Sequence, residues 1–136
     1  MTTTPESSGI GGNVLAAIDE LKLDFQPEEL VVEPDGKGGA RVRFGPVGLS
    51  ETYQQRESWI GGHLTAQVPY SDVYPIFVRG DLARTDGKAL VAPLANGQVF
   101  MGLSAVQVSR KSNRLDASIE TVRMKFKKVL HWINSQ

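Results

Sequence analysis

The stretch WIGGHLTAQVPYSDVYPIF, residues 59–77, decides the fold. It begins as an apolar run typical of a strand, meets Pro69, and enters a second apolar run after Tyr74-Pro75. Because proline fixes φ and lacks a backbone donor, the two prolines predict a rigid connection between two strands. The paired glycines Gly61 and Gly62 indicate either a bulge in the first strand or close approach of another segment.

Hydrophobic periodicity before this stretch predicts a helix followed by two strands. Apolar residues at helical spacing over 13–22 predict a short amphipathic helix, and Asn13 is the candidate cap. Residues 29–34 and 40–44 alternate as strands do and are joined by the turn DGKGG. We interpret residues 45–58 as a loop.

After the stretch, the pattern predicts a long irregular section and a final helix. Residues 81–109 have short apolar runs broken by glycine and proline, and from about residue 116 to 134 apolar residues recur at three- and four-residue steps. The expected fold is therefore α+β: an N-terminal helix, an antiparallel meander of about four strands drawn from residues 29–80, a long looped crossing and a C-terminal helix.

Composition narrows the class of protein. The chain has 136 residues, which suits a single domain over residues 13–136 preceded by a disordered tail over residues 1–12. It has no cysteine, which excludes disulfides and thiolate chemistry and agrees with a cytoplasmic location. We expect no secretory signal and no membrane span. Residues 1–105 carry a net charge of −5 and residues 106–136 a net charge of +5, so a basic end follows an acidic body.

Residues 59–77 resemble the third-strand segment of the ubiquitin-conjugating (UBC) fold, in a bacterial-like divergent form. In that family a strand containing Gly-Gly ends in a proline and a Tyr-Pro follows. The order of elements over roughly residues 13–134 is also similar. The resemblance implies a UBC-like fold in which the proline-rich turn anchors the chain before the active-site crossing. The matching residues are Gly61, Gly62, Val68, Pro69, Tyr74 and Pro75.

The same resemblance implies that the catalytic parts of the family are missing. A conjugating enzyme carries its cargo on a cysteine in this crossing, just after an Asn-Gly turn. Here Asn96-Gly97 match the turn, and Phe100 stands at the nucleophile position. The family's His-Pro-Asn segment, whose amide stabilises the oxyanion, is replaced by a stretch containing Ala92-Pro93. We expect Phe100 to be buried near Tyr74 or Leu103.

Other residues offer little catalytic chemistry. Ser104 is the nearest hydroxyl to Phe100, but a serine is a weak nucleophile unless a base lies within reach. His63 is either a satisfied strand histidine or, less favoured, a base. His131 lies near the end of the last helix, where the dipole favours a cation. Two histidines without a carboxylate pattern predict no metal site, and we expect no cofactor.

A basic cluster before the final helix is a candidate partner-binding site. Arg110, Lys111 and Arg114 lie among serines and an asparagine, a combination that suits a carboxylate, a phosphate or an acidic protein tail. A solvated loop is an equal alternative. Nucleic acid is disfavoured, because the net charge is zero and the basic set lacks interleaved aromatic residues.

Three functions follow as hypotheses. The first is a catalytically silent UBC-like domain that binds a ubiquitin-like protein, its activating enzyme or a partner conjugating protein. The second is an active transferase whose cysteine has been substituted in this chain or replaced by another nucleophile such as Ser104. The third is a plain structural or scaffold domain. The formation of a covalent adduct with the modifier distinguishes the first from the second.

Overall fold

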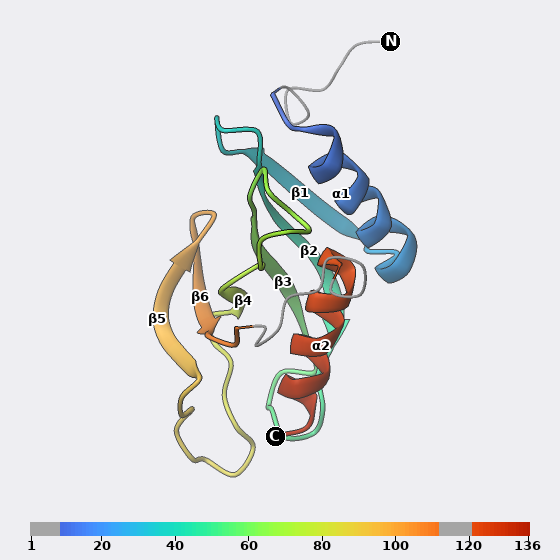
Figure 1. The fold of residues 1–136 in the computed structure, drawn as a ribbon. Coiled ribbons are helices and arrows are strands. Elements are labelled where there is room, and N and C mark those ends of the chain that lie inside the picture. Colours follow the sequence, from blue (N-terminus) through green and yellow to red (C-terminus); the bar gives the residue numbers. More distant parts are fainter. Residues whose placement is uncertain (1–8, 112–120) are drawn as a thin grey trace.

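The computed structural model describes residues 9–111 and 121–136. Within these residues the chain forms an α+β fold with an N-terminal helix, a six-stranded antiparallel sheet and a C-terminal helix (Figure 1). The helices are α1 (Gly12–Phe25) and α2 (Val122–Asn134). The strands are β1 (Glu29–Pro34), β2 (Ala40–Gly48), β3 (Glu57–Leu64), β4 (Ile76–Arg79), β5 (Leu94–Phe100) and β6 (Leu103–Val108).

The sheet is larger than the sequence predicts. Its order is β1-β2-β3-β4-β6-β5, so the β5–β6 hairpin adds two strands beyond β4. The predicted antiparallel meander of about four strands over residues 29–80 is confirmed as β1 to β4, but the irregular assignment of residues 94–108 was wrong, because they form β5 and β6. The loop prediction for residues 45–58 was wrong at both ends, because β2 runs to Gly48 and β3 begins at Glu57. Residues 81–93 do lack a named strand or helix, and contribute one isolated bridge between Tyr53 and Arg84.

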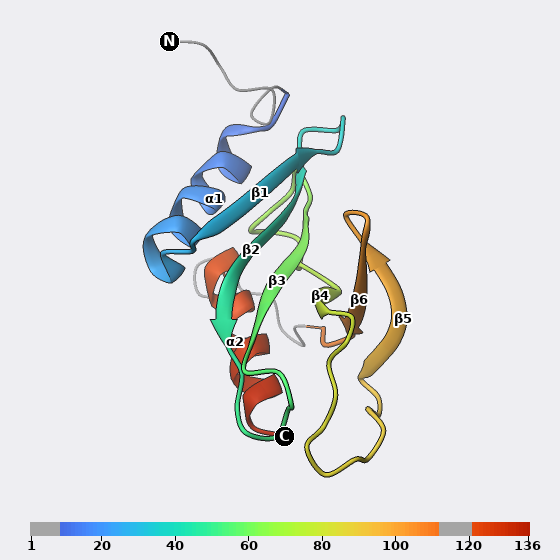
Figure 2. The same cartoon turned by 180° about the vertical axis from the view of Figure 1, so that it is seen from behind.

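Both helices cover one face of the sheet, and the other face of β1–β3 stays open (Figures 1 and 2). The core lies under the helices, because alternate strand residues point to this face. The inward aliphatic side chains of β3, β4 and β6 meet Phe126 and Ile133 of α2 and Val14 and Leu21 of α1 in one buried cluster. The predicted periodicity of the two helices is confirmed for the described residues, since Val14, Ile18, Leu21, Val122, Phe126, Val129 and Ile133 are all buried.

Both helices hold the turn that contains the two prolines. Asn13 is not the helix cap, which is Gly11. Instead its side-chain amide donates to the carbonyl oxygens of Ala66 and Val68 at 2.8 and 2.6 Å. From the other helix, the buried Lys125 ammonium donates to Asp72 at 3.0 Å. The turn is thus tied to α1 at its start and to α2 near its end.

The paired glycines of β3 mark close approach and no bulge. Pairing with β2 and β4 is regular through Gly61 and Gly62. A Cβ on Gly61 would lie 2.6 Å from the Val42 carbonyl oxygen and 2.7 Å from the Phe100 ring. A Cβ on Gly62 would lie 2.8 Å from Val73, on the helix side. Because neither glycine has a side chain, Phe100 can pack against the sheet at Gly61 and Val73 can pack against the other face at Gly62.

The prediction that the disordered tail extends to residue 12 was wrong at its end, because Ile10 is buried, the Gly11 amide donates to the Gly38 carbonyl at 2.9 Å, and Gly12 begins α1. The predicted tail over residues 1–12 lies mostly outside the described residues. Residues 116–120 of the predicted final helix also lie outside them, and the predicted start was too early, because Thr121 is an extended cap and α2 begins at Val122. In the described ranges no helix has both the length and the apolar character needed to cross a membrane.

Candidate functional site

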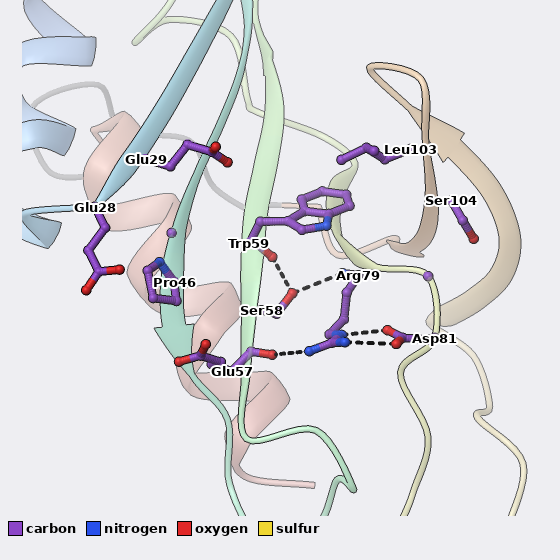
Figure 3. Close-up of a pocket in the computed structure, with 12 residues that line it drawn as sticks. Glu28, Glu29, Pro46, Glu57, Ser58, Trp59, Arg79, Asp81, Leu103 and Ser104 are labelled. Carbon is purple, nitrogen blue, oxygen red and sulfur yellow. Dashed lines mark hydrogen bonds and ion pairs between the residues drawn. The ribbon is translucent and has the colours of Figure 1, made fainter.

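A surface cavity of about 730 Å³ opens where β4 leaves the sheet (Figure 3). Pairing of β3 with β4 stops at Ile60 and Val78, while pairing of β4 with β6 continues to Arg79 and Ala105. The chain therefore diverges from β3 after Arg79 and stays beside β6. The cavity is lined by Glu28, Glu29, Gly45, Pro46, Glu57, Ser58, Trp59, Arg79, Gly80, Asp81, Leu103 and Ser104.

Gly80 sets the width of this opening. A Cβ at this position would overlap the Ser104 hydroxyl and lie 2.7 Å from the Ala105 amide nitrogen. Only a residue without a side chain lets the backbone pass so close to β6. Because the chain follows β6 here, the space beside Ser58 and Trp59 of β3 is left unfilled by backbone.

The Arg79 side chain bridges the gap between β3 and the segment that follows β4. Its guanidinium donates twice to Asp81, at 2.5 and 2.8 Å, and once to the Glu57 carbonyl oxygen at 2.9 Å. The backbone amide of Arg79 donates to the Ser58 hydroxyl at 3.0 Å, and that hydroxyl donates to the Trp59 carbonyl oxygen. The hydrogen bond between the side chains raises the pKa of Arg79 and lowers that of Asp81.

Three aromatic rings on the open face form a stack at the edge of the cavity. The Phe100 ring lies 4.5 Å from Phe77, with an interplanar angle of 12°, and 6.3 Å from Trp59, with an angle of 19°. Phe100 is therefore the middle ring and Trp59 an end ring. Trp59 is half-buried and lines the cavity, whereas Phe100 is only 6% exposed.

The charge of the cavity is negative. Four carboxylates line it against one guanidinium, which is already paired with Asp81. Glu29 is paired with Arg43 at 2.9 Å. Within residues 9–111 and 121–136, Glu28 and Glu57 form no ion pair, although the charge of Glu57 contributes to the raised pKa of Arg79. Two carboxylates thus remain to attract a cation.

Phe100 and Ser104 lie close to this cavity but supply no catalytic centre. The burial of Phe100 is confirmed; it pairs in register with Leu103, and its ring neighbours are Trp59 and Phe77. Ser104 is exposed in the cavity lining. The neighbouring Asp81 has a lowered pKa and is held by two hydrogen bonds from Arg79, which makes it a poor base.

The Asn96-Gly97 turn expected before the nucleophile position is a bulge in β5. The register of β5 with β6 shifts between Ala95 and Gln98, and Gly97 has a φ of 78°. The hairpin turn lies later, at Met101-Gly102, where both residues have positive φ. The turn at Asn96-Gly97 was expected from the resemblance to the UBC family.

The predicted basic cluster is only partly within the described residues, since Arg114 lies outside them. Arg110 and Lys111 are exposed and lie over aromatic rings: Arg110 is 4.8 Å from the Trp132 centroid, and Lys111 is 5.3 Å from the Tyr74 centroid. Tyr74 of the Tyr-Pro motif is itself 39% exposed.

Sequence reasoning missed the partner of His63. Its Nε2 lies 2.7 Å from the Asp35 carboxylate, which also accepts the backbone amides of Lys37 and Gly39 at 2.7 and 3.0 Å. The hydrogen bond to His63 is the largest cause of the lowered pKa of Asp35. The two residues are 28 positions apart, and the antiparallel pairing of β1, β2 and β3 brings them together. His131 is exposed in the last turn of α2, as predicted.

Among the residues that the structure describes, no group of three or more histidine and carboxylate side chains is arranged to hold a metal ion. Comparisons with protein-family models, with curated proteins and with solved structures find no match.

Proposed function

We propose that this chain is a catalytically silent UBC-like domain that binds a protein of a bacterial ubiquitin-like conjugation pathway in the cytoplasm: the modifier, its activating enzyme or a partner conjugating protein. The resemblance of residues 59–77 to the UBC third-strand segment motivates the pathway. The α+β order of helix, antiparallel sheet and helix is compatible with it.

The observation that carries the silent assignment is the burial of Phe100. A phenyl ring is neither a nucleophile nor an acid, and this ring is enclosed between Trp59 and Phe77. Ester formation needs an activated nucleophile, and the chain has no cysteine. Ser104, the alternative, lines the same cavity as Asp81, whose carboxylate is committed to Arg79.

The surface around Arg110 and Lys111 supports the binding part of the proposal. Trp132, under the Arg110 guanidinium, also lines a second cavity of about 410 Å³ together with Arg84, Lys88 and Leu90. Val91 in the same lining is 73% exposed. Cations around exposed apolar side chains suit an acidic protein partner.

The chemical half of the proposal is tested by intact mass. The protein is incubated with activating enzyme, ATP and the cognate modifier, and we expect no adduct. A hydroxylamine-sensitive adduct would overturn the silent assignment and support a transferase that acts through an oxyester, with Ser104→Ala as the first variant to make.

The binding half is tested with a charge-matched pair of variants. Replacing Arg110, Lys111 and Arg114 with Ala should weaken binding to the pathway proteins and flatten its salt dependence, because exposed charges are screened over about 8 Å at physiological ionic strength. Replacing Lys22, Lys37 and Arg56, which are exposed elsewhere, with Ala removes the same charge and should leave binding nearly unchanged. Equal losses in both variants, or no binding by the wild type, would contradict the proposal.

A further inference from the structure

We propose that the cavity beside Trp59 binds an arginine side chain of an extended basic peptide. This site lies on the open face of the sheet and is distinct from the Arg110 surface. The inference does not depend on any conjugation pathway, and its test uses no pathway protein.

The aromatic stack points to a planar group. Phe77, Phe100 and Trp59 lie nearly parallel, and Trp59, as the end ring, is the member that lines the cavity. A flat cation continues such a stack, because the guanidinium of arginine both stacks on an indole and is attracted to its negative face. Trp59 is half-buried and stacks on the buried Phe100 without any ligand, so the platform is already formed.

The carboxylates that line the cavity select a cation. Glu57, two residues before Trp59 in β3, and Glu28, just before β1, line the cavity on the side of Pro46 (Figure 3). Neither forms an ion pair within the described part of the chain, whereas the one lining cation, Arg79, is held by Asp81. A carboxylate presents two oxygens to the fork of a guanidinium, which makes arginine a better fit than lysine.

The shape of the cavity favours a peptide held through its side chains. Its volume of about 730 Å³ exceeds what one arginine side chain fills, and it extends from Glu28 across β3 to Ser104. Addition of a strand to the free edge of β3 is disfavoured. The carbonyl oxygens of Glu57 and Trp59 already accept hydrogen bonds from Arg79 and Ser58.

The test follows the fluorescence of Trp59 in a Trp132→Phe background, which leaves Trp59 as the sole tryptophan. The probe is the peptide acetyl-Gly-Arg-Gly-Arg-Gly-amide, with lysine and citrulline counterparts. We expect saturable quenching by the arginine peptide, binding weaker by about threefold to tenfold for lysine, and none for citrulline, which keeps the planar shape without the charge. Equal binding of the arginine and lysine peptides, or binding of the citrulline peptide, would overturn the proposal.

A pair of charge-matched variants then locates the site. Glu28→Gln with Glu57→Gln should weaken binding of the arginine peptide by about threefold or more, because each exposed ion pair contributes a modest amount. Glu20→Gln with Glu51→Gln removes the same charge from exposed positions outside the cavity. This control should change the affinity less than about twofold, because only the net charge of the protein changes. An equal loss in the two double variants would show that the peptide responds to net charge and would refute the site.

Discussion

The two faces of the sheet are built from the same strands and differ in almost every other respect. The face under the helices is aliphatic, and its side chains from β2, β3, β4 and β6 are almost completely buried. The open face carries ion pairs and aromatic rings, of which Trp59 and Phe77 remain partly exposed. Alternation along each strand assigns successive residues to one face or the other, so a single chain segment contributes side chains both to the core and to the open face. On the open face lie the pairs Arg41–Glu33, Arg43–Glu29 and His63–Asp35 and the stack of Trp59, Phe100 and Phe77.

We expect the largest loss of stability from a substitution on the helix-covered face. Phe126 of α2 is fully buried, and its ring lies 5.2 Å from that of Phe44. Phe126→Ala should lower the free energy of unfolding by about 3–5 kcal/mol, because it removes buried apolar surface and leaves a cavity. Urea denaturation measures the change. Leu23→Ala, on the exposed side of α1, is the control and should have almost no effect, since Leu23 is 78% exposed. A loss below about 1 kcal/mol for Phe126→Ala would mean that packing of α2 against this face does not stabilise the fold.

A smaller loss is expected for the central ring of the open face. Phe100→Ala should lower the free energy of unfolding by about 2–4 kcal/mol, because the ring is buried but its neighbours Trp59 and Phe77 keep some contact with water. Thermal denaturation gives the comparison with Val99→Ala, one residue earlier in β5, where the side chain is 71% exposed. If the two variants have the same melting temperature, the aromatic stack does not stabilise the fold.

The smallest loss of stability is expected at the contact between Asp35 and His63, and this loss depends on pH. The pKa of Asp35 is lower in the folded protein than its ordinary value of 3.8, chiefly because of the hydrogen bond to His63. The stabilisation is therefore complete above pH 3.8 and is lost as the pH falls through the lowered folded pKa. Asp35→Asn should cost about 1–2 kcal/mol at pH 7. Urea denaturation at pH 7, 5 and 3 measures the difference in the free energy of unfolding between wild type and variant. This difference should narrow only between pH 5 and pH 3. A difference that stays constant would contradict the role given to Asp35.

Sequence patterns predicted the helices and strands that depend on residues close together in the chain. Periodicity placed both helices, and alternation placed β1 and the first half of β2 together with the turn between them. The β5–β6 hairpin was missed because β5 holds Asn96-Gly97 in a bulge and exposes most of its residues, so it shows no apolar alternation. Val106 and Val108 do alternate as strand residues do, but this short pattern does not reveal that β6 lies beside β4.

The candidate site was less predictable than the fold. The burial of Phe100 could be inferred from its type and position, but its contacts with Trp59 and Phe77 depend on the order of strands in the sheet. The cavity depends on where β4 separates from β3, and no residue type marks that point except Gly80, one glycine among fourteen. Contacts such as His63 with Asp35 require the register of three strands and cannot be found by scanning for a motif.

The bulge in β5 has a consequence for behaviour at high concentration. β5 and β1 are the two edges of the sheet, where unpaired amide and carbonyl groups can recruit a strand from another molecule. The register shift at Asn96-Gly97 breaks the regular ladder of β5 and makes it a poor template for such pairing. At the opposite edge, Glu29 and Glu33 place charge along β1. Each edge thus carries its own protection against edge-to-edge aggregation.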